Sequence, residues 1–172
     1  MRSLLLKSLL QGPAVMAAPG ASEAAVSELG AALEARIRQK LGRSLAIRAV
    51  DVGSCNGCEL EIHALNNPIY DCERFGLKFV ASPRHADVLL VTGPVAFNMK
   101  QALERTYAAT PAPKFVIALG DCAFDCHVFK GSYAIAGAVA DVIPVDLTIR
   151  GCPPPPLEIL RALLGLVEKM SL

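Results

Sequence analysis

Two continuous apolar runs constrain the fold of this chain more than any other feature. They read "ADVLLVTG" at residues 86–93 and "KFVIALG" at residues 114–120. Short apolar runs bounded by turn residues are typical of strands buried on both faces, as found in parallel sheets covered by helices. Residues 98–109, between the two runs, have the pattern of a helix. A strand, a helix and a second strand in this order predict a parallel unit with a helical crossover.

The rest of the sequence from residue 44 onward alternates in the same way. Further strands are expected at residues 44–52, 77–82 and 141–149, the last in spite of Pro144, with a short segment near residues 132–140. Further helices are expected at residues 59–67, closed by Pro68, and at residues 157–170. This order predicts an α/β fold, with a mostly parallel sheet and helices on both of its faces.

The first 43 residues are predicted to form an extended arm and an amphipathic helix, distinct from an α/β domain at residues 44–172. Apolar residues recur at helical spacing from Ser22, a good N-cap residue, to Gly42. Because only one face of this helix is apolar, that face is expected to pack on the domain.

Residues 1–21 resemble a secretory signal only superficially. Lys7, Gln11 and Pro13 interrupt the leucine-rich stretch, and a signal peptide needs an unbroken apolar run. We therefore expect a cytoplasmic protein whose first residues lie against a partner. Thiols stay reduced in that compartment, so clustered cysteines indicate metal or redox chemistry rather than disulfides.

Composition and hydropathy argue against a nucleic-acid partner and against a membrane-spanning helix. The chain has 17 Lys and Arg against 16 Asp and Glu, and 5% aromatic residues, so it lacks the basic, ring-bearing surface of a nucleic-acid-binding protein. No window approaches the roughly 20 apolar residues of a membrane-spanning helix. Because 53% of the residues are hydrophobic, we expect apolar surface to be buried against other subunits.

Four of the six cysteines follow the ends of predicted strands. Cys55 and Cys58 come after the first strand, Cys122 follows "KFVIALGD", and Cys152 follows "DLTIRG". The carboxyl ends of parallel strands lie along one edge of a sheet, so the four thiols are expected to converge there. Four thiolates suit a 4Fe-4S cluster or a tetrahedral zinc ion. The C-x-x-C pair alone would also suit a thioredoxin-like dithiol, which leaves the other two cysteines without a role.

Small and rigid residues flank these cysteines. Gly53, Gly57, Gly120 and Gly151 would let the backbone approach a bulky ligand and direct amide groups toward its charged sulfurs. The prolines in "GCPPPP" would hold Cys152 on a stiff support. They would equally serve to end the last strand and start the last helix.

The motifs "GSCNGCELEI", "SPRHADVLLVTGP", "GDC" and "VIPVDLTIRGCPPPP" occur in this order. With them, residues 45–170 resemble the small, cluster-bearing subunit of membrane-bound nickel-iron hydrogenases (group 4, energy-converting), which is similar to the 20 kDa subunit of NADH:quinone oxidoreductase. The resemblance implies a flavodoxin-like domain that holds one 4Fe-4S cluster. It also implies Cys55, Cys58, Cys122 and Cys152 as the ligands.

The same resemblance implies partners and a location. The partners are a large catalytic hydrogenase-type subunit, a ferredoxin-like iron-sulfur subunit and integral membrane subunits. The chain would then be a non-catalytic electron-transfer subunit, peripheral on the cytoplasmic face of the membrane. Asn56 and Gly57 separate the first two cysteines, which is the hydrogenase spacing, whereas quinone-reducing relatives typically have two adjacent cysteines. A quinone-reducing or nickel-free ion-pumping complex is the alternative, with a zinc adaptor or dithiol oxidoreductase after it.

Two further residues, Glu59 and Cys126, are expected near the site, and Cys72 is expected away from it. Glu59 follows Cys58 at a helix start and would stabilise the helix dipole, relay protons or orient the large subunit. Cys126, in "DCAFDCHVF", places a fifth thiol near the predicted ligands, where it would substitute for Cys122, respond to oxidation or only fill space. Cys72 is expected to be a core thiol at the opposite end of the sheet.

Overall fold

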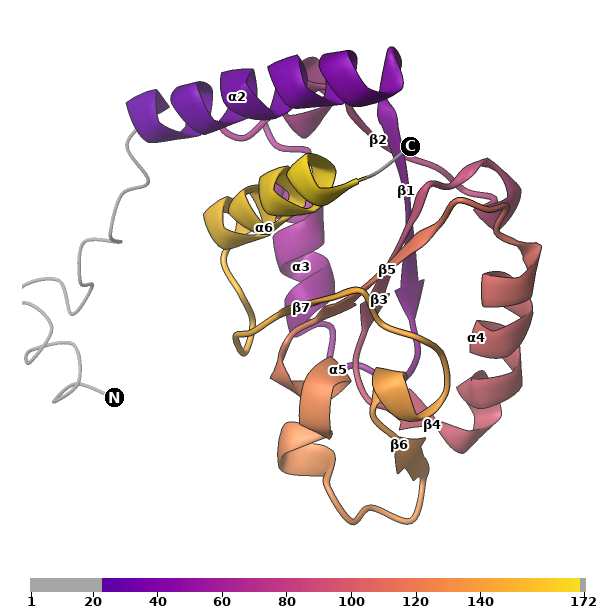
Figure 1. Cartoon of the computed structure of the whole chain (residues 1–172). Coiled ribbons are helices and arrows are strands. Elements are labelled where there is room, and N and C mark those ends of the chain that lie inside the picture. Colours follow the sequence, from indigo (N-terminus) through magenta and orange to yellow (C-terminus); the bar gives the residue numbers. More distant parts are fainter. Residues whose placement is uncertain (1–22, 171–172) are drawn as a thin grey trace, which may run out of the picture.

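The computed structural model describes residues 23–170, and its main sheet has five parallel strands (Figure 1). The strands are β1 (Leu45–Asp51), β2 (Leu77–Phe79), β3 (Val88–Thr92), β5 (Phe115–Leu119) and β7 (Leu147–Ile149). They lie in the order β2-β1-β3-β5-β7. Counted within this sheet alone, the order is 2-1-3-4-5, which is that of flavodoxin-like folds. The predicted α/β class is confirmed.

Helices cover both faces of the sheet, and the side chains of β3 alternate between them. Val88 and Leu90 belong to a core shared with α2 (Glu23–Leu41), α3 (Gly57–Ala64) and α6 (Pro156–Lys169). Leu89 and Val91 belong to a second core, which includes Leu103 of α4 (Phe97–Ala109). Figure 1 shows α4 on one side of the strands and α3 and α6 on the other. Two buried faces explain why the first four residues of this strand are all apolar.

The predicted N-terminal helix is present as α2, which packs against α6 and crosses one end of the sheet (Figure 1). Val26, Leu33 and Ile37 of α2 are buried. The two last-named residues belong to the same core as α6, so α2 is part of the packing of the α/β domain. Ser22 and the predicted arm at residues 1–21 lie outside the described residues, and the boundary at residue 43 stays a prediction.

Three elements are shorter than the sequence predicts. Helix α3 ends at Ala64. Asn67, the predicted last residue of this helix, instead forms a turn, in which its side chain accepts hydrogen bonds from the backbone N–H groups of Ile69 and Tyr70. Strand β2 ends at Phe79. In the last strand only residues 147–149 pair with β5, because residues 139–141 form a short helix, η4 (Val139–Asp141), and Pro144 cannot donate to a ladder.

Residues 95–137 also contain a small second sheet that the sequence does not predict. Strand β4 (Val95–Ala96) pairs antiparallel with β6 (Ile135–Gly137), near the carboxyl edge of the main sheet (Figure 1). Between them in the chain lie α4, β5, α5 (Asp121–Asp125) and η3 (His127–Phe129). The remaining short helices are η1 (Cys72–Phe75) and η2 (Pro83–His85).

Gly30 tests the packing of α2. A Cβ atom at this buried position would lie 2.4 Å from the ring of Phe75. Gly30→Ala should therefore destabilise the fold by about 1–3 kcal/mol through overpacking, although alanine favours a helix by roughly 1 kcal/mol. Urea unfolding measures the difference.

Gly165 of α6 is the matched control. A Cβ there meets no heavy atom within 4 Å in the part of the chain that the structure describes. Gly165→Ala should stabilise by about 0.5–1 kcal/mol. Equal stabilisation by both substitutions would contradict the docked position of α2.

Candidate functional site

Four cysteines from three loops line one cavity at the carboxyl edge of the sheet. Cys55, Cys58, Cys122 and Cys152 all border this cavity, whose volume is about 110 Å³. The three loops start from one row of paired residues, which runs across four strands and consists of Asp51, Thr92, Leu119 and Ile149. Because this row is in register, the residues a few positions beyond it in each chain segment meet at the same place.

The loop after β1 is held by side-chain acceptors. Asp51 accepts hydrogen bonds from the N–H groups of Gly53 and Ser54 at 2.9 and 2.8 Å, and Ser54 Oγ accepts one from the N–H of Asn56 at 3.0 Å. Asn56 then adopts a left-handed conformation with φ of 71°, and α3 begins at the next residue. This turn separates Cys55 from Cys58 and lets both face the cavity.

The loops after β5 and β7 are joined beyond the ends of their strands. The N–H of Gly120 donates to the carbonyl of Ile149 at 2.8 Å, and the N–H of Asp121 donates to the carbonyl of Gly151 at 2.9 Å. Asp121 also accepts a hydrogen bond from Arg150 Nε at 2.6 Å, and this bond is the main reason why the pKa of Asp121 lies below its usual value. Cys122 and Cys152 therefore project from a single hydrogen-bonded assembly.

Gly120 provides the space that the cysteine sulfurs occupy. Its φ is +92°, and a Cβ atom there would lie 2.6 Å from Cys58 Sγ. A Cβ at Gly57 would lie 3.5 Å from Cys55 Sγ, which is an ordinary contact distance. At Gly151, with φ of +139°, a Cβ would lie 2.7 Å from Cα of Pro154. Only glycine fits at positions 120 and 151 without strain.

The thiols lie within electrostatic range of one another. Burial, followed by the charge of Glu59 and those of Cys55, Cys122 and Cys152, raises the pKa of Cys58 from 9.0 to about 12. Burial, followed by the charges of Cys152 and Cys55, also raises the pKa of Cys122. Deprotonating Cys58 and Cys122 is therefore unfavourable unless a positive group balances their charge, as iron does when it binds thiolates.

The donor set and the close glycine fit a 4Fe-4S cluster, for which cysteine thiolates are the usual ligands. Cys122 is buried and Cys58 is half-buried, whereas Cys55 and Cys152 are exposed. Within residues 23–170, no three His, Cys, Asp or Glu side chains are arranged to hold a single metal ion.

The same residues include no helix long and apolar enough to cross a membrane.

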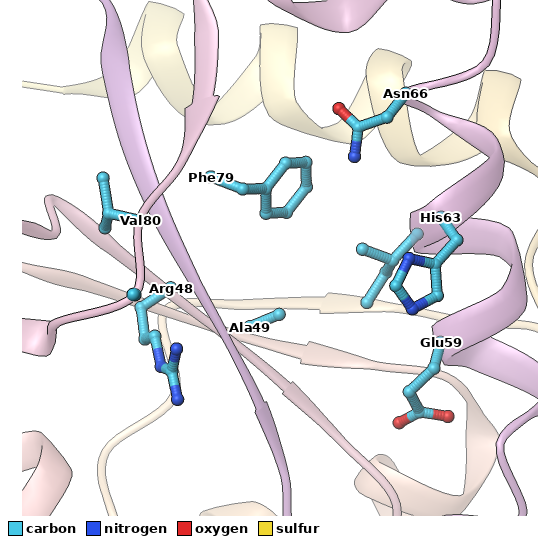
Figure 2. Close-up of a pocket in the computed structure, with 9 residues that line it drawn as sticks. Arg48, Ala49, Glu59, His63, Asn66, Phe79 and Val80 are labelled. Carbon is cyan, nitrogen blue, oxygen red and sulfur yellow. The ribbon is translucent and has the colours of Figure 1, made fainter.

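Glu59 lies at the boundary between the cysteine loop and a second pocket. Both of its carboxylate oxygens are buried and find no hydrogen-bond partner among the described residues. The second pocket, of about 300 Å³, is also lined by Arg48, His63 and Phe79 (Figure 2). Figure 2 shows Glu59 and His63 on the same helix, across from Arg48 on β1.

The two other cysteines lie elsewhere. Cys126 is buried at the end of α5 with φ of 66°, and the residues that line the cavity, all within the described range, do not include it. Its charged neighbours are Asp141, Asp125 and Lys130. Cys72 is fully buried in η1 and donates a hydrogen bond to Asn66 Oδ1 at 3.1 Å.

Pro153, one of the prolines expected to support Cys152, borders the cavity. Sequence reasoning missed three other residues that border it: Ser54, Gly93 and Asp121. Each is next to a predicted strand end or a cysteine, so its position along the chain was a usable signal. Gly93 directly follows β3. No cysteine follows this strand, but its Thr92 pairs with Asp51 in the row of residues from which the cysteine loops start.

Fold and site together define a class of protein: a flavodoxin-like subunit that presents four cysteines from three loops at one sheet edge. Comparison with known proteins gives the family. Residues 55–166 match the family described as the 20 kDa subunit of NADH ubiquinone oxidoreductase. The chain belongs to this family, and the resemblance inferred from the sequence is confirmed.

Individual relatives are named as subunits of a membrane-bound hydrogenase and of a formate hydrogenlyase. A probable membrane-bound hydrogenase subunit of Pyrococcus furiosus is 46% identical over 142 residues, covering 81% of this chain and 85% of the relative. Formate hydrogenlyase subunit 7 of Escherichia coli is 42% identical over 147 residues and covers 84% of this chain. The chain spans only 58% of the length of that second relative.

A solved structure is similar as well. A chain of the membrane-bound sulfane sulfur reductase, an archaeal respiratory membrane complex, superposes with a TM-score of 0.66 at 32% identity. The match covers 79% of this chain and 74% of the other. The relatives thus belong to oxidoreductase complexes, and this chain is a member of a subunit family found in them.

The raised pKa of Cys58 predicts a slow reaction with iodoacetamide, which attacks the thiolate. With a pKa of about 12 instead of 9.0, Cys58 should carry about a thousandfold less thiolate at ~pH 8 than an ordinary cysteine. Timed alkylation of iron-free protein and mass spectrometry of the peptides measure this. The exposed Cys55 in the same loop is the control and should be alkylated first. Equal rates at the two residues would contradict the arrangement described above.

Proposed function

We propose that this chain is an electron-transfer subunit that carries one 4Fe-4S cluster beside the catalytic centre of a larger subunit. The observation that supports the proposal is the cavity lined by Cys55, Cys58, Cys122 and Cys152. A 4Fe-4S cluster held by these cysteines would accept and donate single electrons. The chain itself would not convert substrate.

The residues of the chain would hold and insulate the cluster. Cys58 packs against the main core, and Cys122 is buried, so this side of the site is shielded from water. Cys55 and Cys152 are exposed, so the opposite side is open to a partner subunit. Gly120 would let the backbone approach the sulfurs closely. A site fixed by paired strand ends should reorganise little when an electron arrives.

Hydrogen chemistry in the complex is the preferred form of this proposal. The C-x-x-C spacing and the 46% identity to a probable membrane-bound hydrogenase subunit support it. An NADH:quinone oxidoreductase-like or nickel-free ion-pumping complex is the alternative, and the similarity to a chain of a respiratory sulfane sulfur reductase supports a role outside hydrogenases. In both forms the partners are a large catalytic subunit, a ferredoxin-like subunit and integral membrane subunits. The chain would be peripheral on the cytoplasmic face of the membrane.

Metal analysis separates a cluster from the zinc and dithiol alternatives. After anaerobic purification, we expect about four iron and four sulfide per chain, and an electron paramagnetic resonance signal after reduction. Near-stoichiometric zinc without sulfide would identify a zinc site. A chain without either metal but with a reversible disulfide between Cys55 and Cys58 would identify a dithiol oxidoreductase.

Serine substitution tests the ligands one by one. Replacing Cys55, Cys58, Cys122 or Cys152 by Ser should abolish or convert the cluster, because a hydroxyl is a poor ligand for iron in such clusters. Cys72→Ser and Cys126→Ser are the matched controls and should leave the iron content and the resonance spectrum unchanged. Full retention of the cluster in Cys152→Ser would refute the assignment.

We propose that Glu59 tunes the cluster through its charge rather than by binding it. Its carboxylate is buried beside Cys58 and contributes to the raised pKa of that thiol. Glu59→Gln should make reduction easier and raise the midpoint potential, by on the order of 50 mV, or about 1 kcal/mol for one electron. Potentiometric titration measures this shift. Glu61→Gln on the same helix is the control, and an equal shift in both variants would show that Glu59 has no special role.

A further inference from the structure

Two of the three cysteine loops are linked by side chains as well as by the backbone. Asp121 Oδ1 accepts a hydrogen bond from Arg150 Nε at 2.6 Å and another from the N–H of Gly151 at 3.2 Å. Asp121 immediately precedes Cys122, and Gly151 immediately precedes Cys152. The carboxylate therefore connects the residues that stand directly before two of the four cysteines.

Arg150 also contacts the far side of the Cys122 loop. Its guanidinium lies over the ring of Phe124, 4.1 Å from the ring centroid. Asp121 and Phe124 flank Cys122 on both sides along α5, so one arginine side chain spans the segment that carries this cysteine. The Asp121 side chain is 19% exposed and that of Arg150 is 54% exposed, which places the pair at the rim of the site.

We propose that Asp121 and Arg150 are a positioning pair for the cluster, which hold the Cys122 loop against the Cys152 loop and balance one negative with one positive charge beside the sulfurs. This inference rests on the proposed function. It assigns the pair a role in cluster retention and in the reduction potential, without contact between either side chain and the cluster.

The opposite edge of the sheet provides a matched pair. Asp87 accepts hydrogen bonds from Arg43 at 2.7 and 2.6 Å and from the N–H of Ala46 at 2.9 Å. This pair has the same chemistry and also joins two neighbouring segments, but it lies at the amino ends of β1 and β3. Its removal reports what losing such a pair does to the fold alone.

The experiment uses four variants of the full chain: Asp121→Asn, Arg150→Gln, the double variant, and Arg150→Lys. Asp121→Asn leaves the charge of Arg150 unbalanced, so the midpoint potential should rise. Arg150→Gln leaves the charge of Asp121 unbalanced, so the potential should fall, and the double variant should return close to the wild-type potential. Shifts of opposite sign are not expected from a purely structural role.

Cluster retention is measured as the rate of iron loss to a chelator. Asp121→Asn and Arg150→Gln should lose iron roughly threefold to tenfold faster than wild type, because a charge-assisted hydrogen bond between the loops is weakened. Arg150→Lys keeps the charge but loses the planar guanidinium, so it should keep the potential and still lose iron faster. Arg43→Gln and Asp87→Asn should lower thermal stability and leave both cluster readouts unchanged.

The outcomes distinguish this inference from the proposed function. Wild-type protein without iron and sulfide would refute both. Wild-type protein with a cluster, together with variants whose potentials are unchanged or shift in the same direction, would refute the positioning pair alone. Circular dichroism shows whether each variant folds, and if Asp121→Asn does not fold, the comparison of Arg150→Gln with Arg150→Lys decides the question.

Discussion

The site depends on the register of four parallel strands. Asp51, Thr92, Leu119 and Ile149 pair across β1, β3, β5 and β7 in a single row. Because the loops start from the same row, two or three residues beyond it are enough to bring Cys55, Cys122 and Cys152 together, and Cys58 follows in the first turn of α3. Backbone hydrogen bonds fix the spacing between the strands, so the positions of the sulfurs depend on the sheet as a whole and not on any single loop.

This dependence explains how much could be predicted from the sequence. The apolar runs at residues 86–93 and 114–120 identify buried strands, and buried parallel strands place their carboxyl ends at one edge. Together with the strands predicted at residues 44–52 and 141–149, these two facts predict the convergence of the four thiols. The direction of Cys126 does not, because it depends on a left-handed residue at the end of a five-residue helix, which sequence periodicity does not reveal. The shortening of the last strand was not predicted for a similar reason: a short helix ends at Asp141, where the strand was expected to begin, and only residues 147–149 pair with β5.

Aspartates replace strand pairing where the sheet ends. Asp51 accepts N–H groups of its own loop, Asp121 accepts the N–H of Gly151, and Asp146 accepts the N–H of Val116 at 2.7 Å. Loops at a strand end leave backbone donors without a ladder partner, and an unpaired buried donor is costly. Short acidic side chains satisfy these donors without adding bulk. Asp51 and Asp121 also carry negative charge to the rim that holds the four thiols, and Arg150 balances part of it through its ion pair with Asp121. Asp146 lies at the opposite edge of the sheet, directly before β7.

The two cores and the rim have different physical origins. Of the six cysteines only Cys72 lies among the buried residues of the main core, and Cys58 packs against that core from the cavity side. The sheet and its helices are thus stabilised by apolar burial that does not require the other thiols. The rim, in contrast, gathers groups whose deprotonated forms repel one another, and burial, followed by the charges of Glu59 and the other three cysteines, raises the pKa of Cys58 to about 12. The fold holds the four cysteines in place although their charged forms repel one another. Binding of a positively charged group is therefore favoured, because no further free energy is needed to bring the ligands together.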